Sequence, residues 1–275
     1  MIKNFLIFLA ILPVILIAKY VYDKDKNKEP MRVLSKLLVG GVAACFLTLA
    51  ISYTLSFIFP TSFTLNISAN DSFFKVLLQC FIYIALIEEG SKLIMTYSLS
   101  YKEKAFDEIY DIIIYAVFVS LGFAAFENIL YVLGQAGTGP AITTGILRGL
   151  LAVPGHAIYG MYMGYYLSLA KLANIEGNKT EEKKNIIKSL IIPTILHGTY
   201  DLCCLSAGKS GIIIIVFLIF VITMYIISIK KLKFVATNNR LLIPTSNERP
   251  IPKYCSNCGT PANGLFCEQC GHRIQ

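Results

Sequence analysis

Ionisable side chains interrupt four strongly apolar segments of this 275-residue chain. They are Glu88, Glu89 and Lys92 in the first segment, Glu127 in the second, His156 in the third, and His197 and Asp201 in the fourth. One charged side chain at the centre of a membrane helix costs about 2.5–3.5 kcal/mol on insertion scales. These groups must therefore pair with one another, face a polar cavity or bind a metal ion.

The spacing within "ALIEEGSKLI" leaves one carboxylate without a cation. Glu88 and Glu89 lie four and three residues before Lys92, so all three share one helical face. A single lysine neutralises only one of the two carboxylates. The surplus carboxylate suits general acid–base catalysis if water reaches it. A buried structural ion pair between Glu88 and Lys92 is the plainer alternative.

The other segments add acids and histidines but almost no base. His197 and Asp201 are four residues apart and share a face, while Lys92 and Arg148 are the available bases within the apolar segments. Acids in excess, together with two of the three histidines of the chain, indicate a divalent cation site or a proton-transfer site. Each histidine alone would more simply be an interhelical hydrogen-bond partner.

The elements that carry these residues are expected to be membrane helices. The chain is 55% hydrophobic with a mean hydropathy of +0.63, and its apolar runs reach the roughly 20 residues that a bilayer requires. We therefore predict an all-α polytopic membrane protein with about seven transmembrane helices; short alternating strands, as in a barrel, are absent. The expected spans are 4–22, 35–59, 74–99, 110–134, 141–171, 187–205 and 211–229. In the fifth span we expect a kink or a new start at Pro154–Gly155, and the spacing of Gly160 and Gly164 favours close helix packing.

Lysine-rich loops alternate with loops that carry little positive charge. This alternation predicts a multi-pass protein of the cell membrane with its N-terminus outside and its C-terminus in the cytoplasm. The first span is expected to be an anchor and not a cleaved signal peptide, because a basic segment follows it directly. The net charge of +8 comes largely from these loops and indicates contact with the lipid bilayer, so no nucleic acid partner is expected.

The tail after the last span has a separate chemistry. We divide the chain into a transmembrane domain at 1–233, a flexible linker at 234–253 and a small cytoplasmic domain at 254–275. Cys255, Cys258, Cys267 and Cys270 form two C-x-x-C pairs, the spacing of a zinc ribbon. Four thiolates close the coordination sphere, so this Zn²⁺ would be structural, and a reducing cytoplasm disfavours disulfides. The partner of the ribbon is not identified by the sequence.

Four motifs of the chain, in order, resemble the PrsW family of intramembrane proteases. "EEGSK" is similar to the E-E-x-x-K motif of that family, and "DEIYDIIIYAVFVSLGFAAFENILY" resembles its next block. His156 and the "HGTYD" segment match the remaining histidine and H-x-x-x-D motifs. The resemblance covers about residues 74–205, and the family is similar in turn to the CAAX prenyl endopeptidases.

The resemblance implies hydrolysis of peptide bonds in membrane-anchored, single-span substrates, which in some members are anti-sigma factors of a stress response. By position, Glu88 and Glu89 would activate water, and Lys92 would compensate part of their negative charge. A divalent metal, expected to be Zn²⁺, would be held by Glu127, His156, His197 and Asp201. In a metal-free mechanism the same residues would instead form an oxyanion site. Which of Glu88 and Glu89 is the base stays open.

Two other function classes remain compatible with these residues. A non-catalytic membrane scaffold or regulator of the same superfamily would retain the histidines but has little use for the glutamate pair. A proton- or ion-coupled transporter also places acids and histidines within the membrane, yet the chain shows no clear inverted repeat.

Overall fold

The computed structural model describes residues 2–59, 71–103, 105–239, 253–254 and 261–262. The chain divides into two compact units, residues 1–240 and 241–275. In the second unit two short strands, β1 (Lys253–Tyr254) and β2 (Pro261–Ala262), pair antiparallel. The predicted zinc ligands Cys255, Cys258, Cys267 and Cys270 lie outside the described residues.

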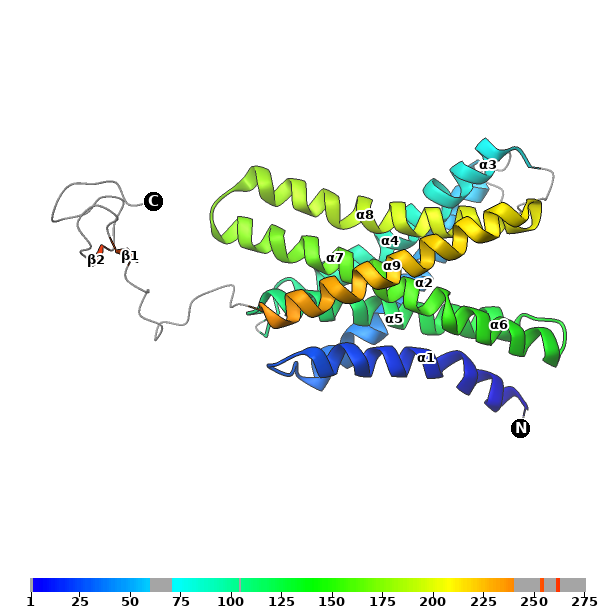
Figure 1. Cartoon of the computed structure of the whole chain (residues 1–275), viewed down its shortest axis with the longest axis horizontal. Coiled ribbons are helices and arrows are strands. Elements are labelled where there is room, and N and C mark those ends of the chain that lie inside the picture. The colour runs from blue at the N-terminus through cyan, green and yellow to red at the C-terminus, as the bar shows by residue number, and fades with distance from the viewer. Residues whose placement is uncertain (1, 60–70, 104, 240–252, 255–260, 263–275) are drawn as a thin grey trace. The chain divides into compact units, whose positions relative to one another are not determined.

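In its described part the first unit is built from helices (Figure 1). They are α1 (Ile2–Lys24), α2 (Met31–Ile58), α3 (Phe73–Leu78), the π-helix η1 (Gln79–Ala85), α4 (Leu86–Ser100), α5 (Ile109–Leu133), α6 (Thr138–Leu150), α7 (Ala152–Ile175), α8 (Lys179–Ser206), the short 3₁₀-helix η2 (Ala207–Lys209) and α9 (Gly211–Thr237).

Six helical stretches of the described residues are long and apolar enough to cross a membrane, judged by length and composition. They are Ile2–Lys24, Met31–Ile58, Ile109–Leu133, Thr138–Ile175, Lys179–Lys209 and Gly211–Thr237. The chain is therefore a multi-pass membrane protein. The predicted span 74–99 is not among the six, although it is helical throughout from Phe73 to Ser100. It consists of three consecutive elements, of which the middle one is a π-helix.

The predicted span 141–171 is two helices, and the prediction of its break was wrong by a few residues. α6 ends at Leu150 and α7 begins at Ala152, so Pro154 lies in the first turn of α7. A proline is tolerated there because the N–H that it lacks would have no partner within the helix. His156 therefore lies in the second turn after a helix start at Ala152, and α6 is a separate element.

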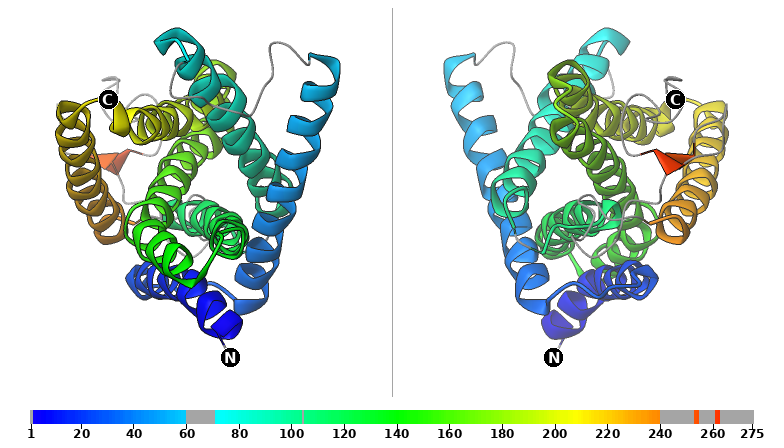
Figure 2. Two further views of the ribbon diagram at one scale, coloured as in Figure 1. Left: turned by 90° about the vertical axis from the view of Figure 1, so that its right-hand side faces the viewer. Right: turned by 90° about the vertical axis from the view of Figure 1, so that its left-hand side faces the viewer.

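Helix α5 forms the core of the first unit. In its most apolar stretch 83% of the residues are buried, compared with 22% in α1 and in α9. Figure 2 shows α5 inside a ring of other helices, with α1, α2 and α7 packed against it. The apolar residues of α5 occur on all of its faces, which fits a helix that is largely covered by protein. The outer helices instead expose large apolar side chains, such as Ile212, Ile215 and Ile219 on α9, as lipid requires.

The basic loops gather at one end of the bundle. Lys26 Nζ donates to the carbonyl oxygen of Thr237 at 3.1 Å, so the α1–α2 loop contacts the end of α9. At the same end Lys36 pairs with Glu103 at 2.6 Å, and Lys171 Nζ donates to a carbonyl oxygen of the α4–α5 loop at 3.1 Å. The loops that alternate in charge along the sequence therefore segregate in space, as the topology prediction requires.

Glycines allow α7 to approach α5 closely. A Cβ atom on Gly164 would lie 2.5 Å from the carbonyl oxygen of Ile112, and one on Gly160 would lie 2.7 Å from that of Ala116. Both neighbours are backbone atoms of α5 and cannot move away alone. The G-x-x-x-G spacing in the sequence therefore does mark a tight helix crossing.

Gly164→Ala is expected to lower the free energy of unfolding by about 1–3 kcal/mol, because the added methyl group must push two helices apart. Thermal unfolding of the purified protein in detergent measures the loss. Gly90→Ala is the matched control, since a Cβ atom there meets nothing within 4 Å. Equal unfolding temperatures for the two variants would contradict the role of the α5–α7 crossing.

Candidate active site

The glutamate pair follows the π-helix directly. Glu88, Glu89 and Lys92 lie in the first two turns of α4, immediately after η1. A π-helical turn shifts the phase of the residues that follow it and occurs frequently at functional sites. Phe81 of η1 packs against Gly198, where a Cβ atom would lie 2.6 Å from its ring. The absence of a side chain at Gly198 thus lets the π-helix approach α8 beside His197.

Lys92 lies at the centre of the ionisable cluster. Its side chain is fully buried, and its Nζ atom lies 2.8 Å from Glu89 Oε1 and 3.4 Å from Glu88 Oε2. The same Nζ atom lies 3.0 Å from His156 Nδ1 and 4.1 Å from the centre of the Phe123 ring. One ammonium group therefore contacts both carboxylates of the pair, a histidine and an aromatic face. It supplies the positive charge that the burial of Glu89 requires.

Hydrogen-bond chemistry fixes the tautomer of His156. A lysine ammonium donates only, so Nδ1 of His156 must accept from Lys92. The proton is then on Nε2, which donates to Glu127 Oε2 at 2.9 Å. Both ring nitrogens of His156 are therefore engaged with protein groups in this arrangement.

The two ring nitrogens of His197 face different groups: Nδ1 faces Glu89, and Nε2 faces Asp201 and Glu88. Its Nδ1 atom lies 2.9 Å from Glu89 Oε1, and its Nε2 atom lies 3.4 Å from Asp201 Oδ2 and 3.9 Å from Glu88 Oε2. A carboxylate beside one nitrogen orients the ring and leaves the lone pair of the other available. Glu89 therefore acts on His197 as an orienting group.

Arg148 is a member of the cluster that the sequence named only as an available base. It donates to Glu127 Oε2 at 2.6 Å and to Asn128 Oδ1 at 2.7 Å, and it lies 4.0 Å from the centre of the Tyr131 ring. Asn128 in turn donates to the carbonyl oxygen of Ala10 at 2.9 Å. Glu127 is thus held by a cation from α6 and by His156.

A cavity of about 710 Å³ opens onto the cluster. Of the predicted site residues, Glu88, Glu127, His156, His197 and Asp201 line it. Glu89 and Lys92 are fully buried behind that lining. The structure therefore brings all seven predicted residues together and divides them into a group that faces the cavity and a group that supports it.

Tyr159 also lines this cavity, and the sequence analysis did not single it out. Its ring stacks on His197 with centroids 4.9 Å apart, and its hydroxyl is buried without a hydrogen-bond partner among the described residues. Its position three residues after His156 on the same helix was the available signal. Tyr159 holds the plane of the His197 ring.

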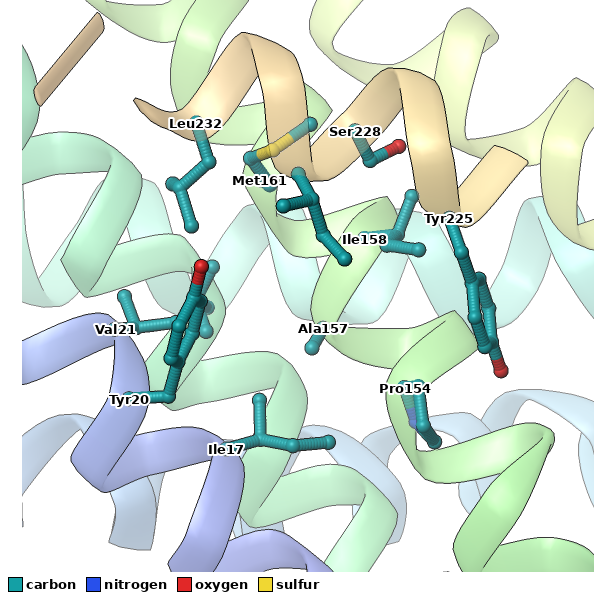
Figure 3. A pocket seen from close by; sticks show the side chains of 12 residues that line it. Ile17, Tyr20, Val21, Pro154, Ala157, Ile158, Met161, Tyr225, Ser228 and Leu232 are labelled. Atoms are coloured by element: carbon teal, nitrogen blue, oxygen red, sulfur yellow. The ribbon is translucent and has the colours of Figure 1, made fainter. Parts of the chain in front are cut away.

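A second cavity, of about 150 Å³, lies between α1, α7 and α9 (Figure 3). Its lining is apolar, with Tyr20, Pro154 and Met161 among the side chains drawn there. The predicted site residues do not line it. Of these two cavities, only the larger is lined by the predicted site residues.

Donor types and distances around His197 fit a divalent metal. Asp201 Oδ2 at 3.4 Å and Glu88 Oε2 at 3.9 Å from His197 Nε2 are close to the spacing of about 3.4 Å between ligands of a tetrahedral zinc. A different group, formed by Glu88, Glu89, His156 and His197 and without Asp201, has ligand atoms that all lie within 4.8 Å of one another. Lys92 contacts three members of that second group, so a metal there would have to displace the ammonium.

Comparison with known proteins identifies the family of the chain. A family model described as PrsW family intramembrane metalloprotease matches residues 29–227. A "Protease PrsW" of Clostridioides difficile is 30% identical over 229 residues, which cover 83% of this chain and 90% of the relative. A "Protease PrsW" of Bacillus subtilis is 33% identical over 193 residues, 70% of this chain and 79% of the relative. No solved structure matches the chain. The chain therefore belongs to the PrsW family of intramembrane metalloproteases.

Proposed function

We propose that this membrane protease cleaves its substrate in the cavity beside α4, with Glu88 as the residue that activates water. The assignment rests on the different positions of the two adjacent glutamates. Glu88 lines the cavity, whereas Glu89 is fully buried and contacts Lys92 and His197. A general base must reach the water that it deprotonates, and of the two adjacent glutamates only Glu88 meets this requirement.

The supporting residues have separate tasks in this proposal. Lys92 holds Glu88 and Glu89 close together against their mutual repulsion. Glu89 accepts a hydrogen bond from Nδ1–H of His197 and keeps the ring in one tautomer. Glu88 takes a proton from water as the water attacks the scissile carbonyl carbon, and then passes that proton to the departing amine.

His197 and Asp201 would act on the carbonyl side of the reaction. When Nδ1–H of a neutral His197 donates a hydrogen bond to Glu89, the lone pair of Nε2 faces the cavity. A lone pair in this position suits a metal ligand. His197 and Asp201 are the residues that would hold a divalent metal, which leaves Glu88 free to act as the base. When bound, such a metal polarises the carbonyl and makes its water more acidic. Without it, the protonated imidazolium of His197 would donate to the oxyanion instead.

Metal analysis tests this assignment. A variant that lacks residues 255–275, and with them the zinc of the predicted ribbon, is expected to retain about one divalent metal per chain. The further substitution His197→Ala should remove that metal, whereas Glu181→Gln, at an acid outside the site whose side chain is 44% exposed, should not. Elemental analysis of the purified proteins measures the content. Active protein without metal would overturn the metal assignment and favour the imidazolium.

We further propose a single-span membrane protein as the substrate, of the anti-sigma class that the family resemblance implies. The proposed orientation puts the N-terminus outside and the lysine-rich end of the bundle, with a four-cysteine zinc ribbon beyond it, in the cytoplasm. Comparative membrane proteomics of cells with wild-type chain and with Glu88→Gln identifies the substrate. A single-span protein should accumulate uncut only in the variant, and identical membrane proteomes would contradict the proposal.

A further inference from the structure

Four acidic side chains gather at the lysine-rich end of the bundle, apart from the catalytic cavity. Asp25 and Glu29 come from the α1–α2 loop, Glu108 caps the N-terminus of α5, and Asp111 lies in the first turn of α5. Their exposed fractions are only 3%, 5%, 7% and 1%. Burial of several carboxylates is costly unless a positive charge compensates them. We call these four residues the acidic cluster.

Among the described residues, every hydrogen-bond donor to the acidic cluster is a neutral group. Asn27 and Asn239 donate their side-chain amides to Glu108, and the Tyr115 hydroxyl donates to Glu29. Backbone N–H groups satisfy both oxygens of Asp25. Such donors solvate the carboxylates, but they leave the negative charge in place.

The two lysines of the same loop point elsewhere. Lys26 Nζ binds the carbonyl oxygen of Thr237, and Lys28 Nζ binds that of Tyr22 at 2.6 Å. The catalytic cluster compensates its buried carboxylates with Lys92 and Arg148, in direct contact. The acidic cluster has no such contact with a lysine or arginine among the residues described.

One buried oxygen of the acidic cluster has no hydrogen-bond donor among the described residues. Asp111 Oδ2 accepts from the backbone N–H groups of Asp107 and Glu108, at 3.0 and 2.6 Å. Asp111 Oδ1 is buried and has no hydrogen-bond partner among the described residues. The Asp111 carboxyl also interacts directly with the Glu29 carboxyl. An oxygen in this position requires either a cation or a proton shared with its neighbour.

We propose that the acidic cluster binds a hard divalent cation, Mg²⁺ or Ca²⁺. One carboxylate oxygen each from Asp25, Glu108 and Asp111 lie within 4.8 Å of one another, close enough to share an ion. A ligand set of oxygens alone selects Mg²⁺ or Ca²⁺ over zinc. Oxygen-bearing side chains also alternate along the loop at Asp25, Asn27 and Glu29. The bound ion would tie the α1–α2 loop to the start of α5.

Thermal unfolding of the purified full-length chain tests the proposal. After removal of divalent ions with EDTA, MgCl₂ or CaCl₂ is expected to raise the unfolding temperature by about 5–10 °C at ~100 times Kd. Asp111→Asn should abolish this rise. Without ions the variant should be no less stable than wild type, because it removes one uncompensated buried charge and its amide oxygen can still accept from the backbone.

Controls separate the acidic cluster from the catalytic cavity. Glu88→Gln should keep the full wild-type response to Mg²⁺ or Ca²⁺, so this test succeeds or fails independently of the proposed catalytic role of Glu88. If Asp111→Asn does not accumulate, Asp25→Asn replaces it, since Asp25 lies in a loop and its backbone donors suit an amide oxygen as well.

Two results would overturn the proposal. If neither ion shifts the unfolding temperature of wild type, and isothermal titration of wild type with MgCl₂ and CaCl₂ gives no heat of binding, Glu29 and Asp111 share a proton. If Asp111→Asn and Asp25→Asn both retain the wild-type shift, the ion binds elsewhere. One bound ion per wild-type chain, lost in either variant, establishes the site.

Discussion

Glu88→Gln is expected to slow cleavage of a single-span substrate by about 100- to 10 000-fold while the protein still accumulates in the membrane. The amide has nearly the shape of the carboxyl group but cannot take a proton from water. Glu88 lines the cavity, and its loss leaves Lys92 paired with the nearer carboxylate of Glu89 at 2.8 Å. The fold should therefore survive, and the defect should appear in kcat.

The rate of product formation by purified protein in proteoliposomes measures this effect. Glu181→Gln is the matched control, because it makes the same chemical change at an acid of α8 that does not line the cavity and whose side chain is 44% exposed. Undiminished cleavage by Glu88→Gln would contradict the assignment of the base. If the wild-type protein cleaves none of the single-span proteins identified by proteomics, the scaffold alternative gains support.

Lys92→Met is expected to have the largest effect on stability. The substitution keeps much of the side-chain volume but leaves Glu88 and Glu89 buried beside each other without a cation. Removing one partner of a buried ion pair typically lowers the free energy of unfolding by about 3–5 kcal/mol. The variant should therefore accumulate poorly and unfold at a lower temperature than wild type.

A double substitution separates charge from packing in this result. Lys92→Met with Glu89→Gln removes the cation and the carboxylate nearest to it, so much of the lost stability should return. Activity should not return, because His197 loses its charged orienting partner. Thermal unfolding and cleavage rates of the single and double variants measure both effects. Equal instability of the two variants would show that Lys92 acts through packing and not through charge.

Several features of the fold were predictable because membrane helices obey local rules. Apolar runs long enough to cross a bilayer identify most helices, and the alternation of basic loops predicts their gathering at one end of the bundle. Spacing of three or four residues places Glu88, Glu89 and Lys92 on one face, as the structure has them. These features depend on residues that are close in sequence.

Other features depend on contacts between distant segments and were not predictable. The π-helix before Glu88 is accommodated where Phe81 packs against Gly198, more than a hundred residues away. Arg148 joins the cluster because α6 is a helix of its own that lies against α5. No local pattern in the sequence marks either pairing.

The sequence by itself determined that this is a multi-pass helical membrane protein, and which acids, bases and histidines must find partners within it, since lipid cannot solvate them. Only the tertiary structure decided the partners. It aims Glu88 into the cavity and buries Glu89 behind it, although the two residues are adjacent in sequence. The physical reason is that adjacent residues on a helix point about 100° apart, so packing of α4 against α5 and α8 gives them different surroundings.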